Sequence, residues 1–167
     1  MSESAKARVL VDGRGKRTDY DEFEIGAPFA TEERVLTFEQ IDFFCRGNQD
    51  YHEWYFLDSP FGGRICPPLM NYRPPRDMFS ANYNVRGVLY EYETENLNPL
   101  RPGKKMRLTG GITNKWVKKE REFVEYSVTC IDEDGVEIFR TRRVHALDVT
   151  PRSAPRETAA ISTFNKL

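Results

Sequence analysis

The second half of the chain has the pattern of long β-strands, and this pattern most limits the folds open to it. The clearest strand spans residues 124–130, where every second side chain is apolar: Val124, Tyr126, Val128 and Cys130. Such an alternation predicts a strand with one buried face. Directly after it, Asp-Glu-Asp-Gly at 132–135 predicts a hairpin turn.

Three further strands are predicted around this hairpin. Residues 88–94 are rich in aromatic and β-branched side chains, and residues 136–147 return as the last strand. Residues 99–103 have the composition of a turn and precede a long strand over 105–117. Within that strand, Gly110 and Gly111 indicate either a bulge or the close approach of another backbone segment.

A short amphipathic helix is predicted over residues 38–46 in the first half. Thr37 and Gln40 have the spacing of a capping box, which satisfies free N–H groups at a helix start. Apolar residues then recur at helical spacing, and Gly47 is the expected stop.

A second helical segment, residues 65–79, contains four prolines. We expect a helix near 67–73, then a break at Pro74 and Pro75, then irregular or 3₁₀ structure to Asn82, because an interior proline pair interrupts a helix. Helices followed by a run of long strands predict an α+β domain, with the helices on one face of the sheet.

The extent of the domain follows from where these patterns begin and end. The 167 residues suit one domain, which we place at 20–149. Residues 1–19 and 150–167 lack periodicity, so we expect a flexible N-terminal segment and a C-terminal tail.

Composition narrows the classes of function. With a net charge of −1, the chain is not expected to bind nucleic acid. It contains no stretch of about 20 apolar residues, so no membrane span is predicted. The N-terminal residues lack the apolar core of a secretory signal, and Cys45, Cys66 and Cys130 lack the spacing of a disulfide framework or zinc site. We therefore expect a cytoplasmic protein with reduced thiols and no metal.

Two short segments of the first half have an informative composition. Residues 47–55 read Gly-Asn-Gln-Asp-Tyr-His-Glu-Trp-Tyr, and residues 58–68 read Asp-Ser-Pro-Phe-Gly-Gly-Arg-Ile-Cys-Pro-Pro. Both segments resemble motifs of the MaoC-like hydratases and dehydratases. In that family, Gly-Asp-x-Asn-Pro-apolar-His follows the first helix, and a Phe-Gly stretch with Ile-Ala-His-Gly leads into a central helix. The resemblance covers roughly residues 20–148. It implies a hot-dog fold, an antiparallel sheet wrapped around a central helix, whose subunits pair edge to edge as a homodimer or a dimer of hot-dog subunits.

Two alignments of the first motif compete. Anchoring on Gly47 puts Asn48 at the family's Asp and makes His52 the catalytic His, with one residue missing. Anchoring on the Phe-Gly pair at 61–62 puts Asp50 at the Asp, His52 at the Asn and Tyr55 at the His. We favour the second alignment because it keeps the acidic residue and its five-residue step to the His position.

The resemblance implies a hydratase or dehydratase that acts at the C2–C3 bond of an enoyl-CoA or acyl-carrier thioester without a cofactor. Asp50 is the candidate base, and His52 is a second titrating group near neutral pH. Tyr55 would hold the water or donate a proton.

Substrate contacts are expected from side chains around the same segments, namely Trp54, Phe61, Gly62, Gly63, Cys66 and Leu69. In the family, a backbone N–H near the Gly of Ile-Ala-His-Gly polarises the thioester carbonyl. Pro68 stands at that Gly and has no N–H, so Leu69 or Met70 would have to donate instead.

Other readings of these residues stay open. Asp50 could be a turn residue, His52 a surface histidine, and Trp54 and Tyr55 packing residues. His145 in the last strand is expected to be structural. Because Tyr55 and Pro68 depart from the family, the chain could be a non-catalytic subunit of a heteromeric hydratase. A hot-dog thioesterase is the third possibility.

Overall fold

A curved antiparallel sheet forms the body of the computed structural model, which describes residues 17–147. Its strands are β1 (Glu32–Val35), β2 (Gly87–Asn96), β3 (Lys105–Lys118), β4 (Arg121–Asp132) and β5 (Glu137–Leu147). The order across the sheet is β1-β3-β4-β5-β2, so β1 and β2 are its edges.

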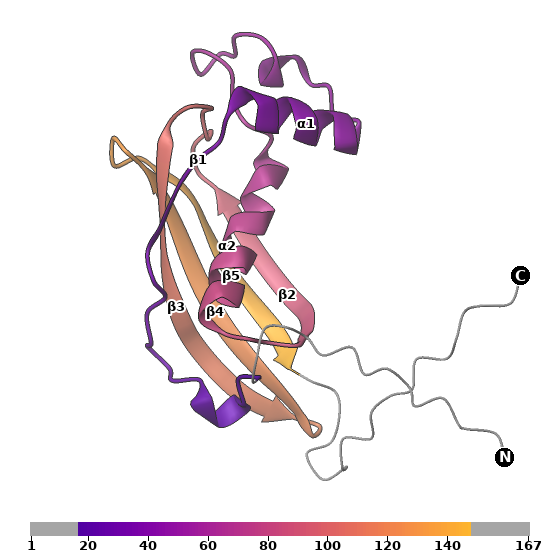
Figure 1. Ribbon diagram of the computed structural model, residues 1–167, viewed down its shortest axis with the longest axis vertical. Coiled ribbons are helices and arrows are strands. Elements are labelled where there is room, and N and C mark those ends of the chain that lie inside the picture. Colours follow the sequence, from indigo (N-terminus) through magenta and orange to yellow (C-terminus); the bar gives the residue numbers. More distant parts are fainter. Residues whose placement is uncertain (1–16, 148–167) are drawn as a thin grey trace, which may run out of the picture.

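Two α-helices and three 3₁₀ turns complete the fold. They are η1 (Tyr20–Glu22), α1 (Phe38–Asn48), η2 (Glu53–Tyr55), η3 (Pro68–Tyr72) and α2 (Arg73–Asn82). Figure 1 shows α2 lying along one face of the sheet, with α1 beyond one end of it. The predicted α+β architecture, a sheet around a central helix, is confirmed.

The predicted strands and hairpin are confirmed with small shifts at their ends. The apolar positions of β4 from Val124 to Cys130 are buried, as the alternation predicts. The turn between β4 and β5 closes where Gly135 N–H donates to Asp132 O (3.0 Å), and Gly135 has a φ of 81°. A positive φ suits glycine, which has no Cβ to clash.

The glycine pair in β3 is explained by close backbone approach. A Cβ on Gly111 would lie 2.5 Å from Ala27 O, because residues 26–29 run alongside β3 at this point. A Cβ on Gly110 would lie 2.3 Å from Ser127 O. The irregularity in the β3–β4 register lies beyond the pair, between Ile112 and Asn114.

Helix α1 begins as predicted but ends later. Gln40 N–H donates to Thr37 Oγ1 (3.3 Å) and Thr37 N–H donates to Gln40 Oε1 (2.9 Å), so the capping box is formed. The predicted stop at Gly47 is wrong, because Gly47 is helical and Gln49 ends the helix with a left-handed φ of 55°.

The prediction for the proline-rich segment is wrong in order. The 3₁₀ turn η3 comes first, and the α-helix begins at Arg73. Pro74 and Pro75 lie in the first turn of α2, where an N–H has no intrahelical acceptor, so the pair starts this helix instead of breaking it.

The core lies between α2 and the sheet. Phe79 of α2 stacks on Tyr126 of β4 with ring centroids 4.3 Å apart. Cys45, Cys66 and Cys130 are free and buried. No helix in the described range is long and apolar enough to cross a membrane.

The N-terminal edge of the described chain is tied to the domain. Thr18 N–H donates to Asn84 O and Asn84 N–H donates to Thr18 Oγ1, each at 3.1 Å. The predicted flexible segment and C-terminal tail fall mainly on residues 1–16 and 148–167, outside the described residues, so these boundaries stay predictions.

Candidate active site

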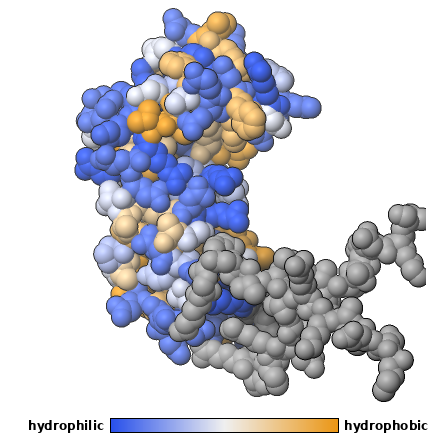
Figure 2. Space-filling model, viewed as in Figure 1, coloured by the Kyte–Doolittle hydropathy of each residue, from blue (hydrophilic) through white to orange (hydrophobic). Residues whose placement is uncertain are grey.

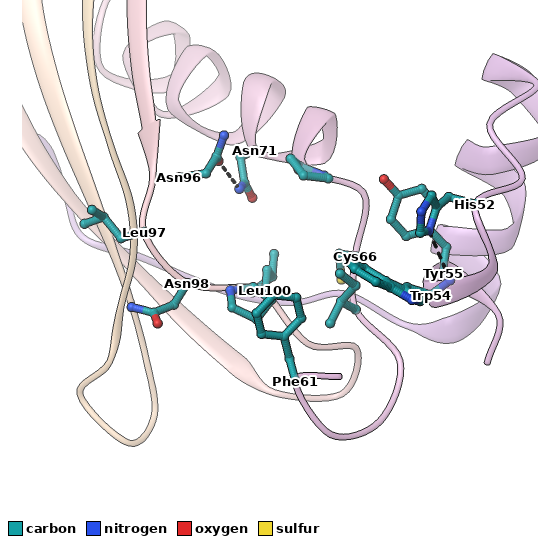
Figure 3. Close-up of a pocket in the computed structure, with 13 residues that line it drawn as sticks. His52, Trp54, Tyr55, Phe61, Cys66, Asn71, Asn96, Leu97, Asn98 and Leu100 are labelled. Carbon is teal, nitrogen blue, oxygen red and sulfur yellow. Dashed lines mark hydrogen bonds between the residues drawn. The ribbon is translucent and has the colours of Figure 1, made fainter. Parts of the chain in front are cut away.

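A pocket of about 330 Å³ opens between η2, the start of η3 and the chain segment that follows β2 (Figure 3). Its lining residues are His52, Trp54, Tyr55, Phe61, Ile65, Cys66, Pro68, Asn71, Asn96, Leu97, Asn98, Pro99 and Leu100. Most of these side chains are apolar or aromatic, which is typical of small-molecule sites.

Five of the nine residues singled out from the sequence line this pocket: His52, Trp54, Tyr55, Phe61 and Cys66. The other four do not line it. Leu69 is 57% exposed to solvent. Gly62 and Gly63 lie in a turn, with φ values of 79° and 74°. Asp50 lies just before the pocket-lining turn η2.

Two hydrogen bonds fix the start of the turn η2. Asp50 N–H donates to Cys45 O (3.0 Å), which brings the chain back against the end of α1. His52 then caps η2, and its Nδ1 accepts from Trp54 N–H (3.3 Å). Because Nδ1 is the acceptor, the proton of the neutral His52 ring is on Nε2.

Tyr55 and Asp50 have complementary properties. The half-buried Tyr55 has its pKa raised, first by burial and then by the negative charge of Asp50. Its hydroxyl is therefore protonated at neutral pH and is a hydrogen-bond donor. The Asp50 carboxylate makes no hydrogen bond or ion pair with any other described residue.

Two arginines hold the walls of the site. Arg64 donates from Nε to Tyr55 O (2.7 Å) and from Nη2 to Asp42 (2.6 Å), so it joins η2 to α1. Arg101 donates to Gly62 O (2.5 Å) and to Phe61 O, which fixes the turn that carries Phe61. The sequence gives no signal for the part that Arg101 plays.

Cys66 belongs to the frame of the pocket. Its N–H donates to Leu100 O (2.7 Å), and burial raises the pKa of its thiol to about 12. A thiol that stays protonated at neutral pH is a poor nucleophile, so Cys66 shapes the wall and does not attack a substrate.

The sequence did not identify the polar end of the pocket. Asn71 of η3 donates from Nδ2 to Asn96 Oδ1 (2.9 Å), a bond that Figure 3 shows between η3 and the end of β2. Asn71 is only 4% exposed, and its Oδ1 has no partner among the described residues. These asparagines are far apart in sequence and belong to no motif.

The first turn of η3 leaves one backbone donor free. Met70 N–H donates to Pro67 O (2.9 Å), and Pro68 has no N–H. Leu69 N–H makes no hydrogen bond within the described chain. Of the two donors expected from the sequence, Leu69 is therefore the available one.

The α1 end of the molecule carries exposed apolar side chains. Figure 2 shows apolar residues among charged ones at the α1 end of the molecule. The exposed large apolar residues of this end include Phe38, Phe43, Leu57, Phe61 and Leu69. Between residues 17 and 147, no three His, Cys, Asp or Glu side chains gather closely enough to hold a metal ion.

Solved structures share this fold at low sequence identity. A MaoC-like dehydratase from Rhodospirillum rubrum is 16% identical with a TM-score of 0.67, over 82% of this chain and 99% of that chain. The R-hydratase PhaJ1 from Pseudomonas aeruginosa is 13% identical with a TM-score of 0.66, over 83% and 97%. The HadBC (3R-hydroxyacyl-ACP dehydratase) complex from Mycobacterium tuberculosis is 15% identical with a TM-score of 0.65, over 78% and 99%.

These similarities confirm the predicted hot-dog fold, and at such identities they establish the fold alone. No protein-family model matches the sequence, and no curated protein matches it. The activity therefore has to be argued from the pocket itself.

Proposed function

We propose that the protein is a hydro-lyase that adds water to, or removes water from, the C2–C3 bond of an acyl thioester carried by CoA or an acyl carrier. One observation carries this proposal: η2 sets His52 and Tyr55 on one wall of an apolar pocket whose other wall is the start of the central-helix segment at Pro68. The fold neighbours include proteins described as dehydratases and an R-hydratase, which favours this chemistry.

Hydration of an enoyl thioester needs a base, an acid and a donor to the carbonyl oxygen. Asp50 accepts a proton from water as the water oxygen bonds to C3. The C2–C3 π pair takes a proton at C2 from His52 Nε2–H while His52 Nδ1 takes up the proton that Asp50 accepted from the water, so that the ring stays neutral and Asp50 returns to a carboxylate. Tyr55, protonated at neutral pH, orients the water through its O–H. Dehydration follows the same steps in reverse.

The thioester oxygen gains negative charge during the reaction. Leu69 N–H, free in the first turn of η3, is the donor that we assign to it. η3 leads directly into α2. We place the enolate oxygen at the start of this helical segment, where the positive end of the helix dipole would stabilise its charge.

Edge-to-edge pairing of two subunits is part of this proposal. Strand β2 is an edge of the sheet and carries the exposed side chains of Val88, Tyr90 and Tyr92. An exposed strand edge with apolar side chains favours pairing with a second strand. We expect a homodimer, and a monomer by light scattering at micromolar concentration would contradict this expectation.

The test of the activity is loss of the conjugated-thioester absorbance when the purified protein meets a panel of enoyl-CoAs. We expect turnover for at least one chain length. An absence of turnover at every chain length, with CoA and with carrier substrates and with any co-purifying subunit present, would contradict the proposal.

A second candidate function is a non-catalytic hot-dog subunit that completes the pocket of a partner. The presence of Tyr55 at the family's His position and of Pro68, which lacks an N–H, favours it. Mass measurement of the complex isolated from its native cell separates the two. An active homodimer rules out the silent subunit.

A further inference from the structure

A polar cluster lies buried between α2 and the sheet. Its members are Tyr126 of β4 and Arg143 and His145 of β5, which are 0%, 0% and 7% exposed. The guanidinium carbon of Arg143 lies 4.9 Å from the ring centre of Tyr72 and 5.9 Å from that of Tyr92. These two rings cover the guanidinium from η3 and β2.

The hydrogen-bonding groups of this cluster are not satisfied by the described chain. Arg143 donates from Nε to Thr141 Oγ1 (3.3 Å), but its Nη1 and Nη2 have no partner. Tyr126 Oη and His145 Nδ1 also make no hydrogen bond of good geometry, although the Arg143 guanidinium lies near enough to Tyr126 Oη to act on the pKa of that hydroxyl. Buried polar groups are normally paired, so a set of unpaired donors around one guanidinium indicates a missing acceptor.

The cluster also carries uncompensated positive charge. Within residues 17–147, Arg143 makes no ion pair with a carboxylate. The charges that act on His145 are those of Arg76 and Arg143, and burial together with these charges lowers its pKa to about 4. Because a buried charge without a counter-charge is strongly unfavourable, an anion would be bound tightly here.

The cluster lies along the same two elements, η3 and β2, that line the candidate active site. Asn71 lines the pocket, and the next residue, Tyr72, covers Arg143. On β2, Asn96 lines the pocket and Tyr92, which pairs with Arg143, lies four residues along the strand. Four residues of strand span about 13 Å. The Asn71–Asn96 hydrogen bond separates the two regions.

We propose that Arg143 binds a carboxylate at the far end of the acyl group, so that the substrate is an α,β-unsaturated thioester with a second, free carboxyl group. This inference rests on the proposed hydro-lyase function. The guanidinium fork matches a planar carboxylate in two parallel hydrogen bonds. Entry of the acyl group requires the Asn71–Asn96 hydrogen bond to open, after which Asn71 also faces the acyl chain.

The test compares enoyl-CoAs of matched chain length that end in a methyl group or a carboxylate. We expect kcat/KM at least about tenfold higher for the carboxylate substrate, because a hydrogen bond to a charged group is strong. Arg143→Met should remove this preference and keep turnover of the methyl substrate. Arg143→Lys, which keeps the charge and loses the fork, should fall between.

Arg142→Met is the matched control. Arg142 is the neighbouring residue of β5, but it is ion-paired with Glu91 and Glu125 and lies outside the cluster. We expect it to keep the substrate preference. We also expect ligand-free Arg143→Met to melt at or above the temperature of the wild type, because replacing an unpaired buried charge with an apolar side chain is not destabilising.

The outcomes are distinguishable. Turnover of both substrates without preference, or a preference that survives in Arg143→Met, would overturn the carboxylate site and leave the hydro-lyase proposal intact. If neither substrate is turned over, the hydro-lyase proposal fails. In that case, a rise in melting temperature with the carboxylate thioester in the wild type but not in Arg143→Met still supports the site, and no rise overturns it. Dissociation of a dimer in Arg143→Met would instead assign Arg143 to a subunit contact and overturn the proposal.

Discussion

The pocket and the buried cluster lie along the same central-helix segment, yet they differ in how their polar groups are satisfied. At the pocket, His52 is exposed and bonded to its own turn, and Asp50 is partly open to solvent. In the cluster, Arg143 is sealed and its terminal nitrogens are unpaired. Groups that exchange protons with water need access to it, whereas a group that recognises charge acts more strongly in a dry, low-dielectric site.

The largest effect is expected from a substitution of the proposed catalytic base at the pocket. Asp50→Asn removes the proposed base, so the hydration rate should fall by about 10³, the scale of general base catalysis. Steady-state turnover of an enoyl-CoA measures it, with Asp58→Asn in the next loop as a control that should keep the rate. An undiminished rate in Asp50→Asn would remove Asp50 from the mechanism.

The next effect separates the two candidates for the family's histidine. His52→Gln should lower kcat by about 10², whereas Tyr55→Phe should lower it by less than about tenfold, because Tyr55 stays protonated and only orients water. The same assay measures both variants. The reverse ranking would make Tyr55 the functional replacement for the histidine.

The pH dependence of stability tests whether His145 in the buried cluster is neutral. Folding lowers the pKa of His145 from 6.5 to about 4, so the unfolded chain takes up this proton at a higher pH than the folded protein. The stability from the neutral ring is complete above pH 6.5 and is lost as the pH falls toward 4. The free energy of unfolding, measured with urea, should fall between pH 7.5 and pH 5 in the wild type. This fall should be about 2 kcal/mol larger than in His145→Gln. Equal pH dependence in both proteins would contradict a buried, neutral His145.

The smallest effect concerns the frame of the pocket. Arg101→Met releases the turn that carries Phe61, so KM should rise by about threefold while kcat changes little, as expected for loss of a few hydrogen bonds at the rim. Arg140→Met is the control, because Arg140 is paired with Glu95 on the exposed sheet. A large fall in kcat would show that Arg101 also positions the reacting groups.

The sequence predicts the fold well because its signals are local. The alternation from Val124 to Cys130 and the capping box at Thr37 depend on neighbours in the chain, and both are formed. The sequence does not predict the order of elements in the proline segment, because Pro74 and Pro75 suit the first turn of a helix and disfavour its interior. Only the packing of Met78 and Phe79 on the sheet decides between these positions.

The two proposed sites also differ in how much of each could be predicted from the sequence. His52, Trp54 and Tyr55 stand in one short motif, so the sequence brings them together. The cluster draws on η3, β2, β4 and β5, so no motif contains it. Arg142 and Arg143 are adjacent and identical in type, and only the strand register shows that Arg142 pairs with glutamates while Arg143 is buried.

The most direct test of the central claim is a crystal structure with an unreactive enoyl-thioester analogue bound. The account predicts that the acyl group fills the pocket between η2 and η3, with C2 and C3 facing Asp50 and His52 and the thioester oxygen near Leu69 N–H. An analogue bound outside this pocket, or bound in it with C2 and C3 turned away from both Asp50 and His52, would contradict the proposed chemistry.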